Sequence, residues 1–385
     1  MLRSAELIRP VLAGVAFVLA TSPAWAQPTM DVQGFVSLGY TLSNGNNYFG
    51  QSTRSGGDMD YYETGLSAYS QMTENVSAAA QLVARKAGQT EAGTPTVDNA
   101  FLDIRVPGSE AGVRLGRVKN PLGLFNMSRD VLATRPSILM PGSVYQEGAG
   151  IRELYFSGDG IQLYQNWFNQ LGNTQFIANF LAKNKGSRQM EKNLTGGNPA
   201  ISNISLSIDN PLIVSVSHET EDGGQRYALS RVEYPISGNY LFSGIPINYQ
   251  LLSRQWFLSA RYNGEKISIT NEWRVGEDVI NATGSGTVTQ KPIGAYVQVD
   301  YRFNSSWSGF TRYDWQNATS ATTSSSSTSS GGDFVVGGIW RFARNWQFNA
   351  ELHRINGQVL VPALDNPQGR TDRTDLLVMM LGYKF

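Results

Sequence analysis

The chain has 385 residues, with 31 Lys and Arg against 31 Asp and Glu, 2 His, 40 Gly and no Cys. The lack of cysteine excludes disulfide scaffolds and Cys-ligated metal centres, and the balanced charge argues against nucleic-acid binding. A mean hydropathy of -0.26 excludes a bundle of transmembrane helices, because each helix needs about 20 consecutive apolar residues.

The first 26 residues have the organisation of a secretory signal peptide. Arg3 and Arg9 form a basic segment that precedes an apolar run over 11–20, and a small-x-small cleavage site follows at 24–26. We therefore predict a signal peptide over 1–26 and a β-barrel over 27–385. The alternative, an N-terminal membrane anchor, would need a longer apolar run.

From residue 27 onward, segments of roughly ten residues alternate between apolar and polar side chains, the pattern of strands with two different faces. In 292–303 one face is apolar and the other is polar or charged. The apolar face carries Ile293, Ala295, Val297, Val299, Tyr301 and Phe303, and the opposite face carries Tyr296, Gln298, Asp300 and Arg302. The same alternation appears in 97–106, 266–275 and 346–353.

The connections between these segments alternate in length. Short ones are predicted at 73–75, 107–110, 169–173, 221–225, 263–265, 304–306 and 343–345. Long ones are predicted at 43–58, 87–96, 119–157, 184–210, 236–254, 277–291, 317–332 and 356–373. Seven short and eight long connections require sixteen strands, with both termini on the side of the short turns, as in bacterial outer-membrane barrels. Eighteen strands remain an alternative if 184–210 contains a hairpin around 204–208.

A soluble β-sandwich or propeller would also contain many short strands. Two features favour a membrane barrel: charges of both signs in the middle of the polar faces, and aromatic residues near strand ends, where lipid headgroups would lie. Seven of the eight tryptophans show this placement. They are Trp167, Trp256, Trp273, Trp307, Trp315, Trp340 and Trp346.

The last segment, 374–385, ends the chain on an aromatic residue. Leu377, Met379, Leu381, Tyr383 and Phe385 share one face. This pattern resembles the carboxy-terminal sorting signal of Gram-negative outer-membrane proteins, which implies the barrel-insertion machinery as a partner. The opposite face is apolar too, which predicts that loop residues pack on it from inside the barrel.

The longest connection, 119–157, is the third on its side of the barrel. Its sequence resembles the corresponding region of the phosphate-selective porin family: Gly-Arg-x-Lys at 116–119, Pro-x-Gly-Leu at 121–124, then Ser-Arg and Arg-Pro-Ser at 128–129 and 135–137. The topology and terminal signals resemble Gram-negative porins generally. That resemblance implies a third outer loop folded into the lumen, where it narrows the pore, and a homotrimer in the outer membrane.

The candidate constriction combines this loop with the barrel wall. Arg129, Asp130 and Arg135 are expected to project into water from the loop, and Arg85, Arg105 and Arg114 to form a basic ladder on adjacent strands. The alternative is that these residues pair with one another or with the wall. Ordinary cross-strand pairs such as Asp103 with Arg114 and Asp300 with Arg312 would weaken the ladder.

The predicted fold class is therefore all-β, a sixteen-stranded antiparallel transmembrane barrel with the third loop in its lumen. The predicted function is passive diffusion of small hydrophilic solutes, with a mild anion preference, because the loop carries Lys119, Arg129, Arg135 and Arg152 but no lysine cluster. Neither a cofactor nor a metal is expected.

Two other classes of function stay open: adhesion or receptor recognition through the long outer loops, and a barrel hydrolase. The hydrolase is the weaker of the two. His218 falls on the lipid-facing side of its strand, and His353 faces the lumen near Glu351 without a nucleophile motif.

Overall fold

The computed structural model describes residues 30–146, 152–284, 286–321 and 325–385. The predicted signal peptide lies outside these residues. None of the helices described is long and apolar enough to cross a bilayer.

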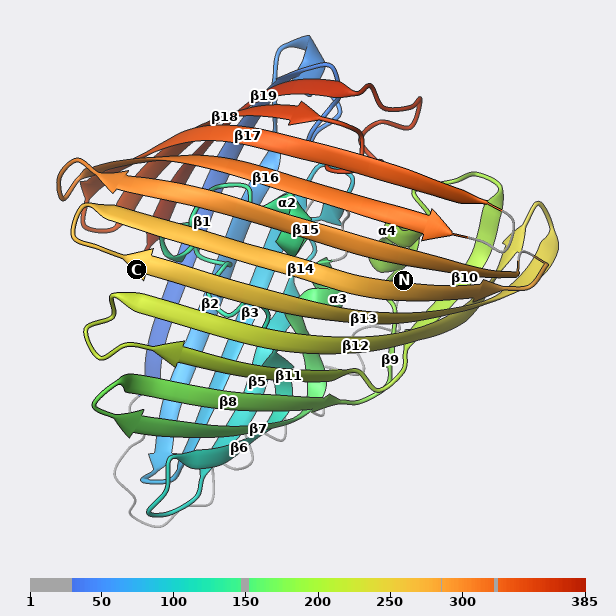
Figure 1. Cartoon of the computed structure of the whole chain (residues 1–385). Coiled ribbons are helices and arrows are strands. Elements are labelled where there is room, and N and C mark those ends of the chain that lie inside the picture. The colour runs from blue at the N-terminus through green and yellow to red at the C-terminus, as the bar shows by residue number, and fades with distance from the viewer. Residues whose placement is uncertain (1–29, 147–151, 285, 322–324) are drawn as a thin grey trace.

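The described residues form one antiparallel sheet whose first and last strands pair with each other (Figure 1). The first half of the sheet comprises β1 (Met30–Asn44), β2 (Asp58–Thr73), β3 (Val76–Ala87), β4 (Glu91–Ala92), β5 (Thr96–Arg105), β6 (Ala111–Lys119), β7 (Ser157–Asn169), β8 (Gly172–Leu181), β9 (Asn184–Lys185) and β10 (Ile201–Ile208). The second half comprises β11 (Leu212–Glu219), β12 (Gln225–Phe242), β13 (Ile245–Asn263), β14 (Ile267–Ala282), β15 (Gly286–Arg302), β16 (Trp307–Ala321), β17 (Ser326–Ala343), β18 (Trp346–Asn356) and β19 (Arg373–Lys384).

These segments make a closed barrel of sixteen strands in the described part of the chain. The two-residue strands β4 and β9 only extend neighbouring strands, and β10 continues β11, because both pair with the same strand, β12. A break over 209–211 separates β10 from β11, which run in the same direction. The predicted strand count is thus confirmed, and the eighteen-strand alternative is wrong because 204–208 forms no hairpin.

Three of the predicted long loops are mostly strand. The segment 236–254 is the clearest case, since β12 and β13 pair as far as Phe242 and Ile245. Ser243 and Gly244 form the turn with φ of 48° and 84°, as a two-residue hairpin turn requires. The same correction applies to 277–291 and 317–332, where β14 to β17 extend beyond the predicted ends. These segments were predicted as loops because they contain Gly, Pro and Asn. In the structure, their backbone N–H and C=O groups form hydrogen bonds with the adjacent strand.

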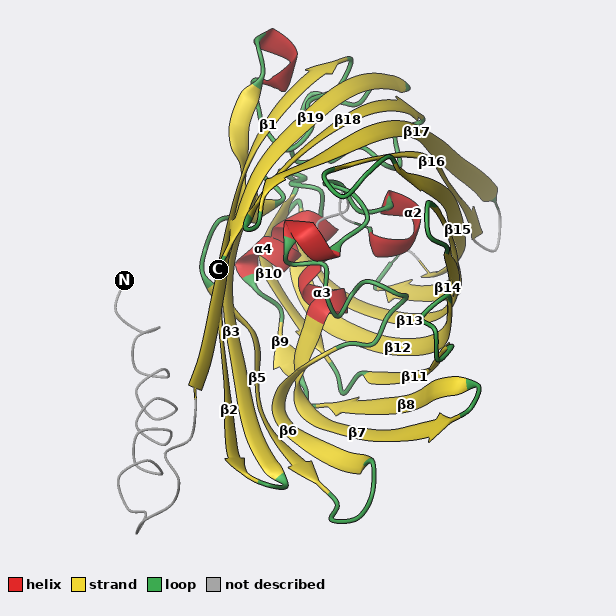
Figure 2. Cartoon of the chain, turned by 90° about the vertical axis from the view of Figure 1, so that its left-hand side faces the viewer, coloured by secondary structure: helices red, strands yellow, loops and turns green. Residues whose placement is uncertain are grey.

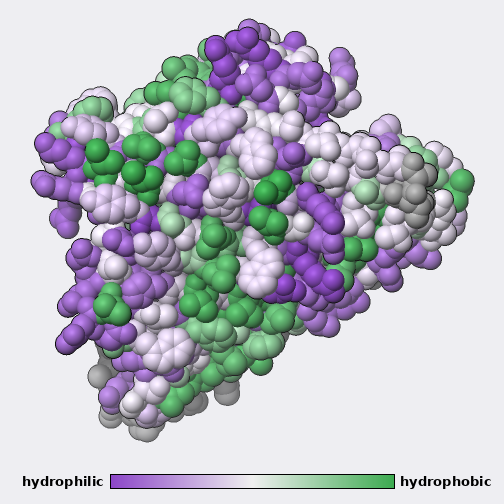
Figure 3. All heavy atoms as spheres, in the orientation of Figure 1, coloured by the Kyte–Doolittle hydropathy of each residue, from purple (hydrophilic) through white to green (hydrophobic). Residues whose placement is uncertain are grey.

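The outward faces of the strands carry large apolar side chains with high exposure, such as Leu258, Tyr313 and Leu352. Figure 3 shows apolar side chains gathered across the middle of one outer face and hydrophilic ones at the left edge. An aromatic belt follows the end with the short turns, where Trp307 stacks on Trp340 with ring centroids 5.2 Å apart. The predicted aromatic girdle is confirmed at this end.

The apolar inward face of the last strand is explained by packing inside the barrel. Leu376, Val378 and Met380 are buried in one cluster with Leu132, Ile138 and Leu139 of the 119–157 loop, and with other loop residues. The alternation of apolar and polar side chains fails on this strand because neither of its faces is in contact with water. The 119–157 loop covers the inward face.

The outer ends of the first, second and last long loops are joined through Asp365. Its carboxylate accepts hydrogen bonds from the backbone N–H groups of Phe49 and Gln89, each at 2.8 Å. Burial raises the pKa of Asp365 to about 6, because the N–H donors only partly offset its loss of hydration.

This raised pKa predicts a pH-dependent stability. A group whose pKa is raised in the folded state stabilises the fold most below its unfolded pKa of about 3.8, and that contribution disappears as the pH rises through about 6. Asp365→Asn should therefore gain stability relative to the native chain between pH 4 and pH 8, by up to about 3 kcal/mol. Denaturant unfolding in detergent micelles at several pH values measures this difference. Asp372→Asn, an exposed carboxylate of the same loop, is the control, and equal pH profiles for both variants would contradict the prediction.

Candidate pore constriction inside the barrel

The loop between β6 and β7, hereafter L3 (residues 120–156), lies inside the barrel. It contains η2 (Leu132–Thr134), α2 (Gly142–Tyr145) and α3 (Arg152–Phe156). Figure 2 shows the α-helices of L3 enclosed by the ring of strands, together with α4 (Arg188–Leu194) of the next long loop. The predicted fold-back of the third loop is confirmed.

Glu272 of β14 holds two segments of L3, one near its start and one around α2. Its carboxylate accepts hydrogen bonds from the Leu124 backbone N–H at 2.8 Å and from the Tyr145 hydroxyl at 2.7 Å. On the next inward position of β14, Arg274 Nε donates to the Ser143 backbone oxygen at 2.8 Å. Because these wall residues are buried, their bonds to L3 replace the water that they lose.

A second anchor lies further along the same part of the wall, on β16 and β18. Glu351 accepts hydrogen bonds from the backbone N–H groups of Ile138 and Leu139, and Arg312 donates to the Ser137 hydroxyl at 2.7 Å. His353 bonds Glu351 at 3.2 Å and Asp333 at 2.7 Å, and its side chain is fully buried. The histidine predicted to face the lumen does so, and it supports a loop anchor instead of reaching open solvent.

The third anchor is a buried triad of charges. Glu63 of β2 pairs with Arg85 Nε of β3 at 2.8 Å and with Arg135 Nη2 of L3 at 2.8 Å. Arg85 also pairs with Glu91. One wall arginine and one L3 arginine thus share a single carboxylate, which fixes this part of L3 to the wall.

The fourth contact, the Lys119 cluster (Asp98, Lys119, Asp130 and Arg152), joins β5, β6 and L3. Lys119 pairs with Asp130 and, at 2.9 Å, with Asp98, while Arg152 pairs with Asp130 at 2.5 Å. Burial alone would raise the pKa of Asp130, but the two adjacent cations outweigh burial and lower it. The cluster therefore combines two cations with two carboxylates at the wall.

The structure places the predicted constriction residues differently from the expectation. Arg129 is buried, with its guanidinium 4.4 Å from the centroid of the Phe156 ring, and Arg135 is held by Glu63. These two residues and Asp130 do not project into open water, because L3 packs against the wall and each charge meets a wall or loop partner. Their pairing with the wall is the alternative that the sequence left open.

The predicted basic ladder is also divided. Arg85 belongs to the Glu63 triad, and Arg114 pairs with Asp103 at 2.8 Å, as the cross-strand alternative predicts. Arg105 is exposed toward the turn end of β5. The predicted pair of Asp300 with Arg312 does not form. Arg312 donates to L3, and Asp300 accepts from Gln298.

Two cavities lie next to the Lys119 cluster. One, of about 440 Å³, is lined by Asp98 and Arg152 together with residues of β3 and α4. The other, of about 350 Å³, is lined by Lys119 and Asp130 together with Arg114 and other residues of β3 to β7. The ion pairs of the cluster thus connect residues that line one cavity to residues that line the other.

The carboxylates that fix L3 were not among the predicted site residues. Glu63, Glu272 and Glu351 were recognisable as inward-facing residues from strand alternation, but nothing local indicated that they bind loop amides. Asp98 was missed because a bulge between β3 and β5 shifts its register. Among the described residues, no group of acidic, His or Cys side chains could hold a metal ion.

Comparison with known proteins gives similarity in structure only. No family model and no curated protein matches the chain. Solved outer-membrane proteins do. A loop-L8 deletion mutant of OmpT, an outer membrane protein of Vibrio cholerae, has a TM-score of 0.61 and 10% identity, covering 94% of this chain and 100% of that one. OmpT folded in vitro, in its trimer form, gives 0.58 and 10% with the same coverage.

A third similar structure is the anion-selective porin from Comamonas acidovorans, with a TM-score of 0.54 and 12% identity, covering 93% of this chain and 100% of that one. Identities this low establish the fold alone. The chain has the fold of the outer-membrane porins, a closed antiparallel barrel of sixteen strands with its third long loop folded into the lumen.

Proposed function

We propose that this chain is a porin of the Gram-negative outer membrane that lets small hydrophilic solutes diffuse through its lumen. The observation that carries the proposal is the pair of cavities on either side of the Lys119 cluster, inside a barrel whose outer face is apolar. Both cavities are lined by charged and polar side chains, which suits a path for hydrophilic solutes. The exposed apolar side chains of the outer face are suited to contact with the hydrocarbon tails of the bilayer.

The constriction is assigned to L3 and the wall that it contacts, with the Lys119 cluster as its narrowest charged part. In this proposal, Arg129, Arg135 and Arg85 keep L3 in place, while Asp130 and Arg114 line the path itself. The aromatic last strand, ending at Phe385, is the segment proposed for recognition by the barrel-insertion machinery. A homotrimer is supported by the trimer form of OmpT, a protein of similar fold.

Reconstitution in planar bilayers tests the proposed function. Stepwise, ohmic conductance increments are expected for a diffusion pore. A correctly folded protein that inserts and gives no conductance would contradict the proposal.

Lys119→Gln tests the assignment of the constriction. Without the ammonium group, Asp98 and Asp130 leave an excess of negative charge beside both cavities, so the pore should shift toward cations. The reversal potential in a salt gradient measures this shift.

Two further variants complete the test. The double variant Lys119→Gln/Asp98→Asn restores the charge balance and should return the reversal potential toward that of the native chain. Arg354→Gln, which faces outward and pairs with Asp375, should leave it unchanged. An unchanged reversal potential in Lys119→Gln would place the constriction elsewhere.

A further inference from the structure

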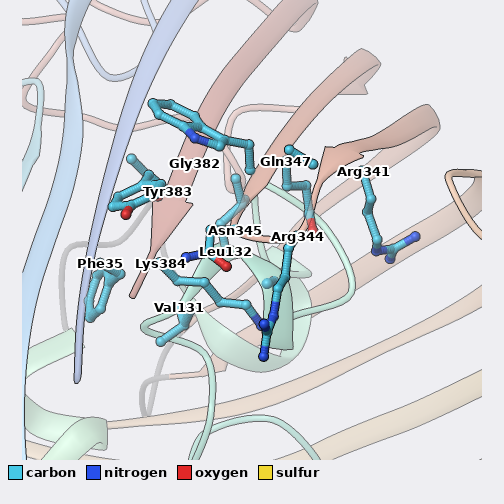
Figure 4. A pocket seen from close by; sticks show the side chains of 14 residues that line it. Phe35, Val131, Leu132, Arg341, Arg344, Asn345, Gln347, Gly382, Tyr383 and Lys384 are labelled. Carbon is cyan, nitrogen blue, oxygen red and sulfur yellow. The ribbon is translucent and has the colours of Figure 1, made fainter. Parts of the chain in front are cut away.

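Four cations gather at the turn end of the lumen, on the wall formed by β15 to β19. Arg302, Arg341 and Lys384 occupy inward positions near the ends of β15, β17 and β19, and Arg344 lies in the turn between β17 and β18. Arg341, Arg344 and Lys384 line one pocket (Figure 4). Figure 4 shows the side chains of Arg344 and Lys384 extending in the same direction. We call these four residues the mouth cluster.

None of the four forms an ion pair with a carboxylate in the part of the chain that the structure describes. Arg341 Nη1 donates to the Ser308 hydroxyl at 3.1 Å, and Arg302 Nη1 donates to the Glu265 backbone oxygen at 2.8 Å. The mouth cluster therefore places four cations that no ion pair neutralises at one end of the lumen, in a chain whose formal net charge is +0.

The charges deeper in the lumen are arranged differently. Arg85 and Arg135 share Glu63, and the two cations of the Lys119 cluster meet two carboxylates. Because opposite charges at such distances largely cancel at longer range, these groups leave little net field along the path. The mouth cluster, by contrast, contributes positive charges that no ion pair neutralises in the described residues.

The mouth cluster also lies next to the tip of L3. Its pocket, of about 130 Å³, is bounded on one side by Val131, Leu132 and Ala133 of L3. Leu132 can approach the last strand because residue 382 is glycine: a Cβ there would lie 2.8 Å from a methyl group of Leu132. Val131 also lines the 350 Å³ cavity beside the Lys119 cluster. Residues 131–133 of L3 thus connect this cavity to the pocket of the mouth cluster. A solute that moves between the cavity and the turn-side opening therefore passes this segment.

We infer that the mouth cluster is an anion filter at the periplasmic opening, which concentrates small anions such as chloride and inorganic phosphate. This inference rests on the proposed function, since it requires a conducting pore. Positive charges at one opening raise the local concentration of anions and lower that of cations. The residues are exposed, so their field is screened over a Debye length, and the anion preference should weaken as salt concentration rises.

The triple variant Arg341→Gln/Arg344→Gln/Lys384→Gln tests the filter. We expect its chloride-to-potassium permeability ratio to fall about threefold at low salt and to approach that of the native chain at 1 M salt, where the Debye length is about 3 Å. The matched control Arg54→Gln/Lys185→Gln/Lys192→Gln removes three exposed cations from the opposite end of the barrel, and none of them lines a cavity of the proposed path. An equal fall in both variants would show that only net charge matters and would overturn the inference.

A second experiment avoids any effect of substitution on assembly. The chain contains no cysteine, so Arg344→Cys introduces a single thiol that can be modified in the folded, conducting protein. A negatively charged methanethiosulfonate reagent should lower the permeability ratio, and a positively charged one should restore it. Conductance without any response to either reagent would refute the filter while leaving the pore intact. A protein without conductance would refute the proposed function itself.

Discussion

Glu63→Gln is expected to loosen L3 and to raise both the mean current and the current noise of the open channel. The substitution removes the negative charge that Arg85 and Arg135 share, so two buried guanidinium groups lose a common partner, although Arg85 keeps its ion pair with Glu91. Removing one partner from a buried ion pair typically costs about 3–5 kcal/mol, because the remaining charge loses its compensation. The anchors at Glu272 and Glu351 remain, so only the segment of L3 around Arg135 should lose its attachment to the wall.

Single-channel recording and limited proteolysis of L3 measure this effect. Glu91→Gln is the matched control, since Glu91 also pairs with Arg85 but forms no ion pair with L3 in the described residues. The double variant Glu63→Gln/Arg135→Met removes the uncompensated charge as well and should recover part of the stability. Unchanged current noise and proteolysis in Glu63→Gln would show that the triad does not hold L3.

Replacing residues 128–139 by a short Gly-Ser linker is expected to raise conductance severalfold. These residues cross the lumen between the Lys119 cluster and the Glu351 anchor, so their removal joins spaces that L3 now separates. The barrel should still form, because its strands are paired around the whole circumference independently of L3. Stability should fall by about 1.5–3 kcal/mol for each large apolar side chain that loses its burial, Leu132 and Ile138 among them.

The control for this deletion shortens a different segment by a similar length. Removing residues 319–328 shortens the connection between β16 and β17, and none of its described residues lines either cavity of the proposed path. Conductance of that variant should equal the conductance of the native chain. A similar rise in both deletions, or none in the L3 variant, would contradict the assignment of L3 as the constriction.

Most of the barrel wall was predictable because strand alternation is a local property. Successive side chains point to opposite faces, so residues such as Val297 and Gln298 reveal lipid and lumen sides without knowledge of the partner strand. The short turns were found for the same reason, since each interrupts the pattern at a defined place. The ends of the long hairpins were not predicted. The segment 236–254 has the composition of a loop, and it forms strands only because its two halves pair with each other.

The interior was decided by contacts between distant segments. Glu272 binds the amide of Leu124, 148 positions earlier in the chain, and no local pattern encodes that distance. Arg312 could pair with Asp300 on the adjacent strand, yet it donates to L3, because the folded loop brings uncompensated carbonyl and hydroxyl groups to it.

The sequence by itself therefore determined the number of strands, their inward and outward faces, and the presence of a loop long enough to enter the lumen. Only the tertiary structure decided which charges are neutralised and which remain free. In the described residues, free positive charges lie at the turn end, in the mouth cluster and at Arg105, whereas the other two arginines of the predicted ladder are paired. The physical reason is that burial forces each charge in the packed interior to find a partner, whereas water at the opening supplies the hydration that unpaired charges need.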